Sequence, residues 1–181
     1  WCSGPAAGFV CTESKTEFYI KCLASITKIP TIRNNMLQHI EVKDLLVGDI
    51  VKTTRGNLPL SHIMKTDTTG RKHTYVKVAK DSLGRNLPSE DLYVTHERSF
   101  SLGYYKNKFL NRNIHDEEQD DMVYLHITAD ELADKVPGIS RVERTFDAAI
   151  NLVFDEHVSI DIYGLDVMTH HPKGNPYTLP Q

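Results

Sequence analysis

The side chains best suited to covalent chemistry in this chain are one cysteine and a few histidines. Cys22 stands in the stretch "YIKCLASITKI" (19–29), between a mixed run and an alternating run. A thiolate is a strong nucleophile, but a thiol is weakly ionised near neutral pH and needs a lowered pKa or an adjacent base. Without such help Cys22 would be a small buried hydrophobe. Groups that could assist it occur in "LYVTHERSF" (92–100), "FDEHVS" (154–159) and "THHP" (169–172).

Short strand-like segments surround these residues and must position them. Alternating apolar and polar residues, with Gly, Asn and Pro between the runs, predict an all-β domain of barrel or sandwich type. One segment, "TADELADKV" (128–136), predicts a helix, with Thr128 as N-cap and Glu131 completing a capping box. The predicted strands lie within 18–29, 39–60, 73–80, 90–102 and 150–169.

Composition excludes several classes of protein. The chain has 181 residues, of which 40% are hydrophobic and 25% charged, as expected for one globular domain. Its formal charge is −3 and it has no long basic stripe, so we expect no nucleic-acid partner. No apolar run approaches the roughly 18 residues of a membrane span, so we expect no membrane partner. The chain begins at Trp1, which we interpret as a processed form or an excised segment.

Three cysteines leave two pairings open. Cys2 and Cys11 could form a disulfide, which would leave Cys22 as the reactive thiol. Alternatively all three are thiols of a reducing compartment. The sequence therefore does not decide the compartment.

Two segments in order resemble the start of the Hint superfamily, the domain shared by Hedgehog autoprocessing modules and inteins. Members open with a cysteine, a threonine five positions on and an apolar residue two later, followed by a "V-x-D-L-x-x-G-D-x-V" segment. Residues 76–95 and 150–172 are similar to later strands of such domains, the latter to forms from large DNA viruses and bacteria. The resemblance covers roughly residues 18–176. The matching residues of the two opening segments are Cys22, Thr27, Ile29, Val42, Asp44, Leu45, Gly48, Asp49 and Val51.

The resemblance implies a fold and a self-directed reaction. The fold would be a flat all-β horseshoe with pseudo-twofold symmetry. Cys22 would attack the carbonyl of Lys21 to form a thioester, in a single turnover and without a cofactor. The substrate would be the chain's own flanking segments, and the domain would be a monomer. The implied parts are a leader (1–21), the Hint domain (22–169) with a central insertion at about 103–140, and a tail (170–181).

The second motif of the family departs from its pattern here. The family takes the proton for the leaving nitrogen from a T-x-x-H motif. Thr95 matches the threonine, but Arg98 replaces the histidine, and His96 stands one residue after the threonine. Neighbouring residues of a strand point to opposite faces, so His96 could take over only at a bulge. Arg98 would be a poor proton donor, although it could hold an oxyanion, and the plainer interpretation is a half-buried strand end with an exposed charged pair.

The closing motif departs as well. Gly164 and Leu165 match the family's final turn, but Met168 and Thr169 occupy the positions of its His-Asn pair. Threonine has no side-chain amide to cyclise, so full splicing is not expected. His171 is a candidate because viral-type relatives end in a similar "T-x-H-P". His157 falls where such domains place a second acid or base, and the alternative for both histidines is an exposed position.

Three hypotheses follow. The first is autoprocessing through a thioester that ends in cleavage or ligation. The second is a catalytically inactive Hint fold that acts as a binding or structural module. The third is a metal site built from Cys22 and the histidines, but no pair has a recognised zinc spacing, so we expect no metal. A cysteine protease acting on other proteins has no supporting signature in the sequence. The candidate site residues are Cys22, Thr95, His96, Arg98, His157 and His171, with Lys21–Cys22 as the scissile bond.

Overall fold

The predicted all-β class is confirmed. The computed structural model describes residues 9–11, 22–105, 108–110 and 123–169, and this part holds two sheets, one short α-helix and one 3₁₀ turn. The elements are β1 (Phe9–Cys11), β2 (Leu23–Ala24), β3 (Lys28–Arg33), β4 (Met36–Glu41), η1 (Val42–Asp44), β5 (Ile50–Thr53), β6 (Gly56–Pro59), β7 (His62–Asp67), β8 (His73–Val78), β9 (Leu92–Val94), β10 (Ser99–Tyr105), β11 (Lys108–Leu110), β12 (Val123–Thr128), α2 (Ala129–Lys135), β13 (Ile139–Arg144), β14 (Ala148–Val153), β15 (Ser159–Ile162) and β16 (Leu165–Met168).

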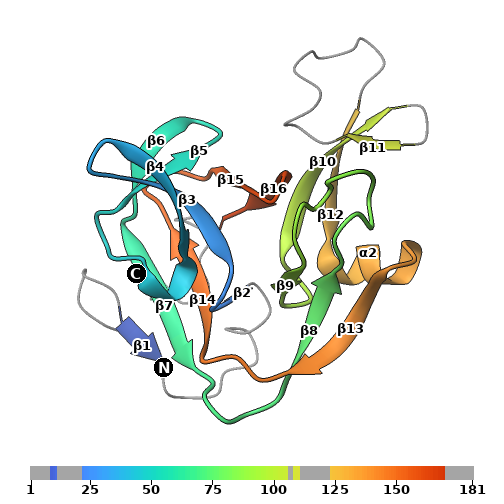
Figure 1. The fold of residues 1–181 in the computed structure, drawn as a ribbon, viewed down its shortest axis with the longest axis horizontal. Coiled ribbons are helices and arrows are strands. Elements are labelled where there is room, and N and C mark those ends of the chain that lie inside the picture. The colour runs from blue at the N-terminus through green and yellow to red at the C-terminus, as the bar shows by residue number, and fades with distance from the viewer. Residues whose placement is uncertain (1–8, 12–21, 106–107, 111–122, 170–181) are drawn as a thin grey trace, which may run out of the picture.

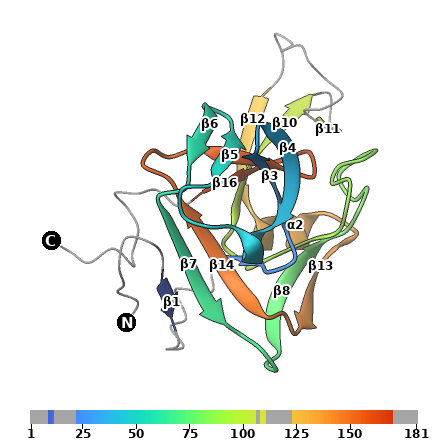
Figure 2. The same ribbon diagram turned by 60° about the vertical axis from the view of Figure 1, so that its left-hand side comes forward.

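The first sheet has a twofold strand order. Its seven strands run β1-β7-β14-β2-β9-β8-β13. The six strands from β7 to β13 are symmetric in this order. Exchanging β2 with β9, β7 with β13 and β8 with β14 gives the same order in reverse. Both ribbon views show two arms, β7 beside β14 in one and β8 beside β13 in the other (Figures 1 and 2). The short strands β2 and β9 pair antiparallel at the centre, so residues at their ends lie between the two halves.

The second sheet joins the arms across the molecule. It follows the order β11-β10-β16-β15-β5-β3-β4, with β12 beside β10 and β6 beside β5. Two of its hairpins close on two-residue turns in which both residues have positive φ, Asn34–Asn35 and Tyr163–Gly164. This is the type I′ geometry that matches the twist of paired strands and that Asn and Gly adopt at low cost. The main core draws buried side chains from both sheets, among them Leu23, Val94, Ile150, Val51, Phe100 and Val167.

The segment that resembles "V-x-D-L-x-x-G-D-x-V" has a structural role. Its Asp49 carboxylate accepts hydrogen bonds from Arg33 Nη2 at 2.6 Å and from the backbone N–H of Leu46 at 2.7 Å. The bond from Arg33 holds the pKa of Asp49 below its ordinary value. Gly48 precedes it with φ of +93°, a conformation that glycine adopts without strain. These contacts fasten the loop between η1 and β5 against β3.

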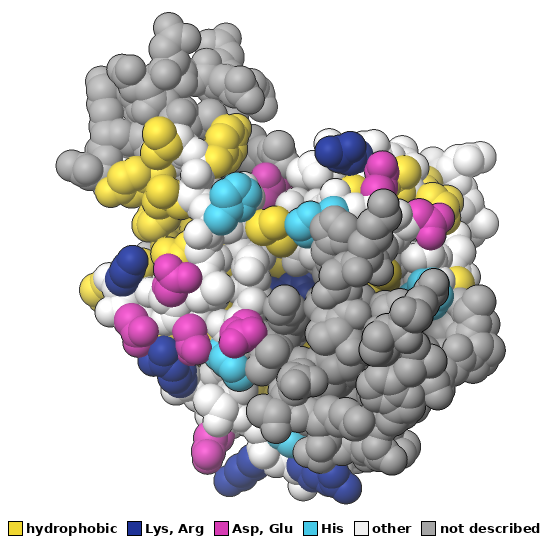
Figure 3. All heavy atoms as spheres, turned by 180° about the vertical axis from the view of Figure 1, so that it is seen from behind, with side chains coloured by type: hydrophobic (Ala, Val, Ile, Leu, Met, Phe, Trp, Pro, Cys, Tyr) yellow, Lys and Arg dark blue, Asp and Glu magenta, His cyan; other side chains and the backbone are white. Residues whose placement is uncertain are grey.

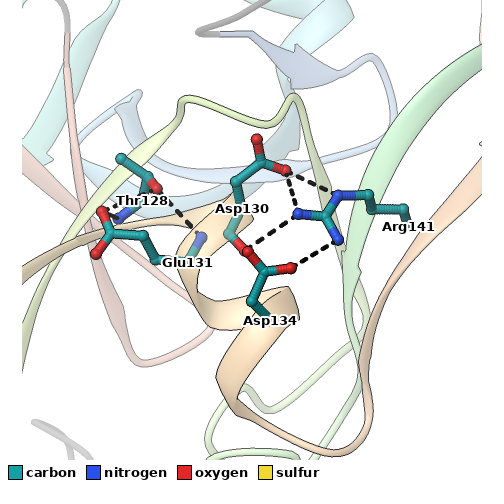
Figure 4. Close-up of polar contacts among 5 residues, drawn as sticks. All are labelled: Thr128, Asp130, Glu131, Asp134 and Arg141. Atoms are coloured by element: carbon teal, nitrogen blue, oxygen red, sulfur yellow. Dashed lines mark hydrogen bonds and ion pairs between the residues drawn. The ribbon is translucent and has the colours of Figure 1, made fainter.

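The predicted helix and its capping box are confirmed. The Thr128 side chain accepts from the N–H of Glu131, and the Glu131 side chain accepts from the N–H of Thr128 (Figure 4). Arg141 of β13 binds Asp130 and Asp134, each at 3.0 Å, which ties the helix to the sheet. In the part of the chain that the structure describes, no helix is long and apolar enough to cross a membrane.

Removing the cap is expected to destabilise the fold modestly. The Thr128→Ala variant loses one side of the capping box, and we expect its free energy of unfolding to fall by about 1 kcal/mol. Urea unfolding followed by circular dichroism measures the change. Ser140→Ala, at an exposed position of β13, is the matched control and should change stability by less than about 0.5 kcal/mol. Equal stability of the two variants would contradict the assigned cap.

Two predicted strands are interrupted. Within 18–29 the described residues form β2 and β3, separated by a turn in which the N–H of Thr27 donates to the carbonyl of Ala24. Within 90–102 the chain forms β9 and β10, separated by a turn at residues 95–98. In the first turn the Thr27 hydroxyl also donates to the carbonyl of Ala24. In the second turn the carbonyls of residues 95, 96 and 98 accept from backbone N–H groups.

The arm that holds β8 and β13 also carries the paired strands β10 and β12, which expose apolar side chains (Figure 1). Val123 is 52% exposed and Tyr124 is 48% exposed, both on β12. Seen from behind, apolar side chains gather on this arm, while acidic and basic side chains are interspersed below it (Figure 3). This surface lies away from the centre of the first sheet, where the candidate site is found.

Candidate functional site

Three polar positions meet at the centre of the seven-stranded sheet. Leu23 of β2 pairs with Ile150 of β14 on one side and with Val94 of β9 on the other. Extending both registers by one residue sets Cys22 opposite Asn151 and opposite Thr95. Residues opposite each other across paired strands project to the same face of a sheet. The register therefore brings together a thiol, a hydroxyl and an amide.

Thr95 holds the backbone of Cys22 on both sides. Its Oγ1 accepts a hydrogen bond from the Cys22 N–H at 2.6 Å. Its own N–H donates to the Cys22 carbonyl at 3.0 Å, and its hydroxyl lies 3.4 Å from the same carbonyl oxygen. Cys22 is fully buried and Thr95 is 3% exposed. The amide nitrogen that Thr95 Oγ1 contacts belongs to the peptide bond between residues 21 and 22.

The turn after β9 places Arg98 under the same sheet. The N–H of Arg98 donates to the carbonyl of Thr95 at 3.1 Å, which closes a four-residue turn. The first N–H groups of α2, those of Ala129 and Asp130, donate to the carbonyls of Arg98 and His96 at 2.9 Å each. The helix therefore fixes the turn. The interpretation of an exposed charged pair is wrong for Arg98, which is 2% exposed, because the turn brings position 98 back toward the core.

Arg98 carries a buried positive charge next to Cys22. Its Nη1 donates to Asn151 Oδ1 at 2.9 Å. Burial lowers the pKa of Arg98 to about 10, and the negative charge of a Cys22 thiolate opposes this shift as a smaller effect. A group with this pKa stays protonated at neutral pH. The guanidinium is thus a permanent cation whose charge interacts with the sulfur of Cys22.

Asn151 is a member of this cluster that the sequence analysis missed. It lies in β14, whose six residues are all buried, and is itself 0% exposed. The available signal was a single polar residue inside the apolar run "AAINLVF". Buried polar groups are usually hydrogen-bonded, and here the partner is a buried arginine more than fifty positions away, which the sequence pattern does not reveal.

His96 stands apart from these contacts. It is the second residue of the turn and is partly exposed. Its backbone carbonyl receives the hydrogen bond from α2 described above, so its backbone serves the turn. No bulge turns position 96 toward Cys22, and the turn instead brings together positions 95 and 98. The proposed role of the His96 imidazole stays a prediction.

His157 lies in the loop between β14 and β15. Its Nε2 is 3.1 Å from the carbonyl oxygen of Thr169, just after β16. The Thr169 hydroxyl donates to the carbonyl of Val158 at 2.6 Å. These bonds hold the last described residue against the start of β15. Two other candidates, Lys21 and His171, lie outside the described residues, and so does Cys2 of the possible disulfide.

Two solved structures are similar to this chain. They are crystal structures of the gp41-1 intein, one of a substituted form at 15% identity and one without substitutions at 16%. Each alignment covers 83% of this chain and 98% of that chain, with a TM-score of 0.43. No family model matches the chain, and no curated protein matches it.

The described residues offer no cluster for a metal ion. No group of three or more His, Cys, Asp or Glu side chains is placed to hold one in this part of the chain. The cluster around Cys22 instead combines a thiol, a hydroxyl, an amide and a guanidinium. These groups can supply a nucleophile, hydrogen bonds and a positive charge, and acyl transfer needs groups of these kinds.

Proposed function

We propose that this chain is an intein-like autoprocessing domain in which Cys22 attacks the carbonyl of Lys21. One observation supports this reaction above others: Thr95 Oγ1 lies 2.6 Å from the Cys22 nitrogen, the atom that must leave. If Cys22 had only a structural role, a backbone carbonyl would be a sufficient acceptor for its N–H. Here it faces a hydroxyl, beside a buried thiol and a buried cation.

The reaction is an isomerisation that balances without another reactant. Cys22 Sγ forms a bond to the carbonyl carbon of Lys21, and the carbonyl oxygen becomes an oxyanion. The C–N bond then breaks, which gives a thioester between Lys21 and Cys22 and a free amino group on Cys22. The thiol proton ends on that nitrogen. Because the peptide nitrogen leaves only when protonated, proton delivery limits the rate.

Thr95 and Arg98 assist different atoms in this reaction. The Thr95 hydroxyl oxygen orients the peptide N–H in the starting state, and as the nitrogen becomes tetrahedral the hydroxyl can donate to its new lone pair. The Arg98 guanidinium stabilises the thiolate by charge, but it seldom gives up a proton. With a pKa of about 10 the guanidinium is a weak acid at pH 7, so it is a poor source of the proton that the leaving nitrogen needs. We therefore propose a slow reaction.

The thioester is resolved by water or a thiol, so the outcome is cleavage or ligation. The closing position supports this outcome. Thr169 has a hydroxyl bonded to Val158 and no amide that could cyclise on its own carbonyl. We expect the bond between residues 169 and 170 to stay intact. The flanking residues 1–21 are then the acyl group that leaves.

Incubation with a thiol tests the proposal. With dithiothreitol the chain is expected to separate after Lys21 into residues 1–21 and 22–181, seen by intact-mass spectrometry. The Cys22→Ala variant should remain whole, because it has no nucleophile. Persistence of the parent chain under all conditions, or equal cleavage of the alanine variant, would refute the proposed reaction.

A second candidate is an inactive domain of the same fold that acts as a binding module. The observation that favours it is Arg98, a poor proton donor where the resemblance places a histidine. It predicts no cleavage by thiols in the parent chain. The two candidates are therefore separated by the same incubation.

A further inference from the structure

The orientation of the Asn151 amide is determined by its partner. Arg98 Nη1 donates to Asn151 Oδ1 at 2.9 Å, and a guanidinium has donors only. The amide oxygen must therefore face Arg98, and the NH₂ group must point elsewhere. Because Asn151 is fully buried in β14, it cannot turn this group to solvent.

The NH₂ group of Asn151 has no acceptor among the described residues. Its Nδ2 atom is buried and makes no hydrogen bond in this part of the chain. Such a donor is costly to leave unsatisfied, and its presence calls for an explanation. By register the residue opposite Asn151 is Cys22, and the peptide bond before Cys22 is the proposed scissile bond. The vacant donor therefore lies in the same row of residues as Cys22, whose nitrogen belongs to this bond.

From this arrangement, and resting on the proposed function, we infer that Asn151 is a further catalytic residue whose side-chain N–H donates to the oxyanion formed on the Lys21 carbonyl oxygen. As Cys22 Sγ bonds to the carbonyl carbon, the negative charge moves from sulfur to this oxygen. The N–H then gains the acceptor that it lacks in the starting state. When the C–N bond breaks, the carbonyl forms again and the charge is discharged with the proton transferred to nitrogen.

The oxyanion is a better acceptor for this N–H than the thiolate. The positive charge of Arg98 already interacts with the sulfur of Cys22. Side-chain amides are among the groups that stabilise oxyanions in acyl transfer, and the loss of one such donor costs about 10²–10³-fold in rate. In the parent chain Arg98 also turns the amide so that its N–H is free among the described residues. Without Arg98 the amide still lies buried in β14 opposite Cys22 and can rotate to present this N–H.

The test compares Asn151→Ala with the parent chain in the rate of thiol-induced cleavage after Lys21. We expect a loss of about 10²–10³-fold. A role limited to holding Arg98 is separated by a double-mutant cycle with Arg98→Met, which keeps the side-chain volume and removes the guanidinium. If Asn151 is a donor, Asn151→Ala still slows cleavage in the Arg98→Met background. Thermal unfolding of each variant verifies that it is folded.

The outcomes separate this inference from the proposed function. If the parent chain cleaves and Asn151→Ala cleaves equally fast, the donor role is refuted and the proposed function stands. If Asn151→Ala slows the parent chain but has no effect in the Arg98→Met background, Asn151 only positions Arg98, which also refutes the donor role. If neither the parent chain nor the Arg98→His variant cleaves, the proposed function fails and this role fails with it.

Discussion

The Arg98→His variant is expected to release residues 1–21 about 10²–10⁴-fold faster than the parent chain, which is the range of positioned general-acid catalysis. Position 98 lies at the end of a turn that starts at Thr95, which contacts the Cys22 nitrogen. A protonated imidazole placed there can give its proton to the leaving nitrogen, whereas the guanidinium of Arg98 almost never does. The measurement is the rate of fragment formation in dithiothreitol, followed by mass spectrometry.

The pH dependence gives a second signature of this variant. Cleavage by the Arg98→His variant needs a protonated imidazole and a thiolate, so its rate should pass through a maximum and fall at high pH. In the parent chain the pKa of Arg98 is lowered only to about 10, so its charge is constant between pH 6 and about 9. The parent rate should therefore rise through this range as the thiol ionises.

The Arg98→Gln variant is the matched control. Glutamine keeps a hydrogen-bond donor for Asn151 but has no proton to transfer, so it should not accelerate cleavage. If Arg98→His is no faster than Arg98→Gln, proton delivery at position 98 does not limit the reaction. The slow step assigned to the parent chain would then be wrong.

The Thr95→Val variant is expected to lose both activity and stability. Valine has nearly the shape of threonine but lacks the hydroxyl that contacts the Cys22 N–H at 2.6 Å. It leaves this buried donor without its acceptor, which costs about 1–3 kcal/mol of unfolding free energy. In the proposed mechanism the hydroxyl also assists the leaving nitrogen, so cleavage should slow by at least about 10²-fold. Urea unfolding and the cleavage assay measure the two effects.

The control for stability is Thr27→Val. Thr27 is 2% exposed, and its hydroxyl donates to the carbonyl of Ala24 at 2.8 Å, in the turn just after β2. This variant loses a buried hydrogen bond near the site without touching the peptide bond before Cys22. We expect it to be less stable than the parent chain while it cleaves at nearly the parent rate. Equal rates for Thr95→Val and Thr27→Val would remove Thr95 from the mechanism.

Much of the fold was predictable because local signals and tertiary structure agree. Alternation identified most of the strands, and the Thr128–Glu131 capping box identified the helix. The breaks at residues 25–27 and 95–98 were not predicted. In both, the side chain or backbone of a threonine replaces ladder hydrogen bonds, and threonine is also a common strand residue. Composition alone cannot separate these two uses of one residue type.

The site was predictable only in part, because its residues come from three distant segments. Cys22 and Thr95 followed from motif positions, and the structure joins them by hydrogen bonds. Arg98 was recognised as a departure, but its burial depends on a turn held by α2. Asn151 was missed because its significance depends on register: β14 pairs with β2, and only that pairing sets position 151 opposite Cys22.

The most direct test of the central claim is the mass of residues 1–21 after treatment with hydroxylamine. Hydroxylamine attacks a thioester carbonyl but leaves an ordinary peptide bond intact under mild conditions. The mechanism predicts a fragment that ends at Lys21 as a hydroxamate from the parent chain, formed faster by Arg98→His and not at all by Cys22→Ala. A parent chain and an Arg98→His variant that both keep their full mass would contradict the claim that Cys22 activates the bond to Lys21.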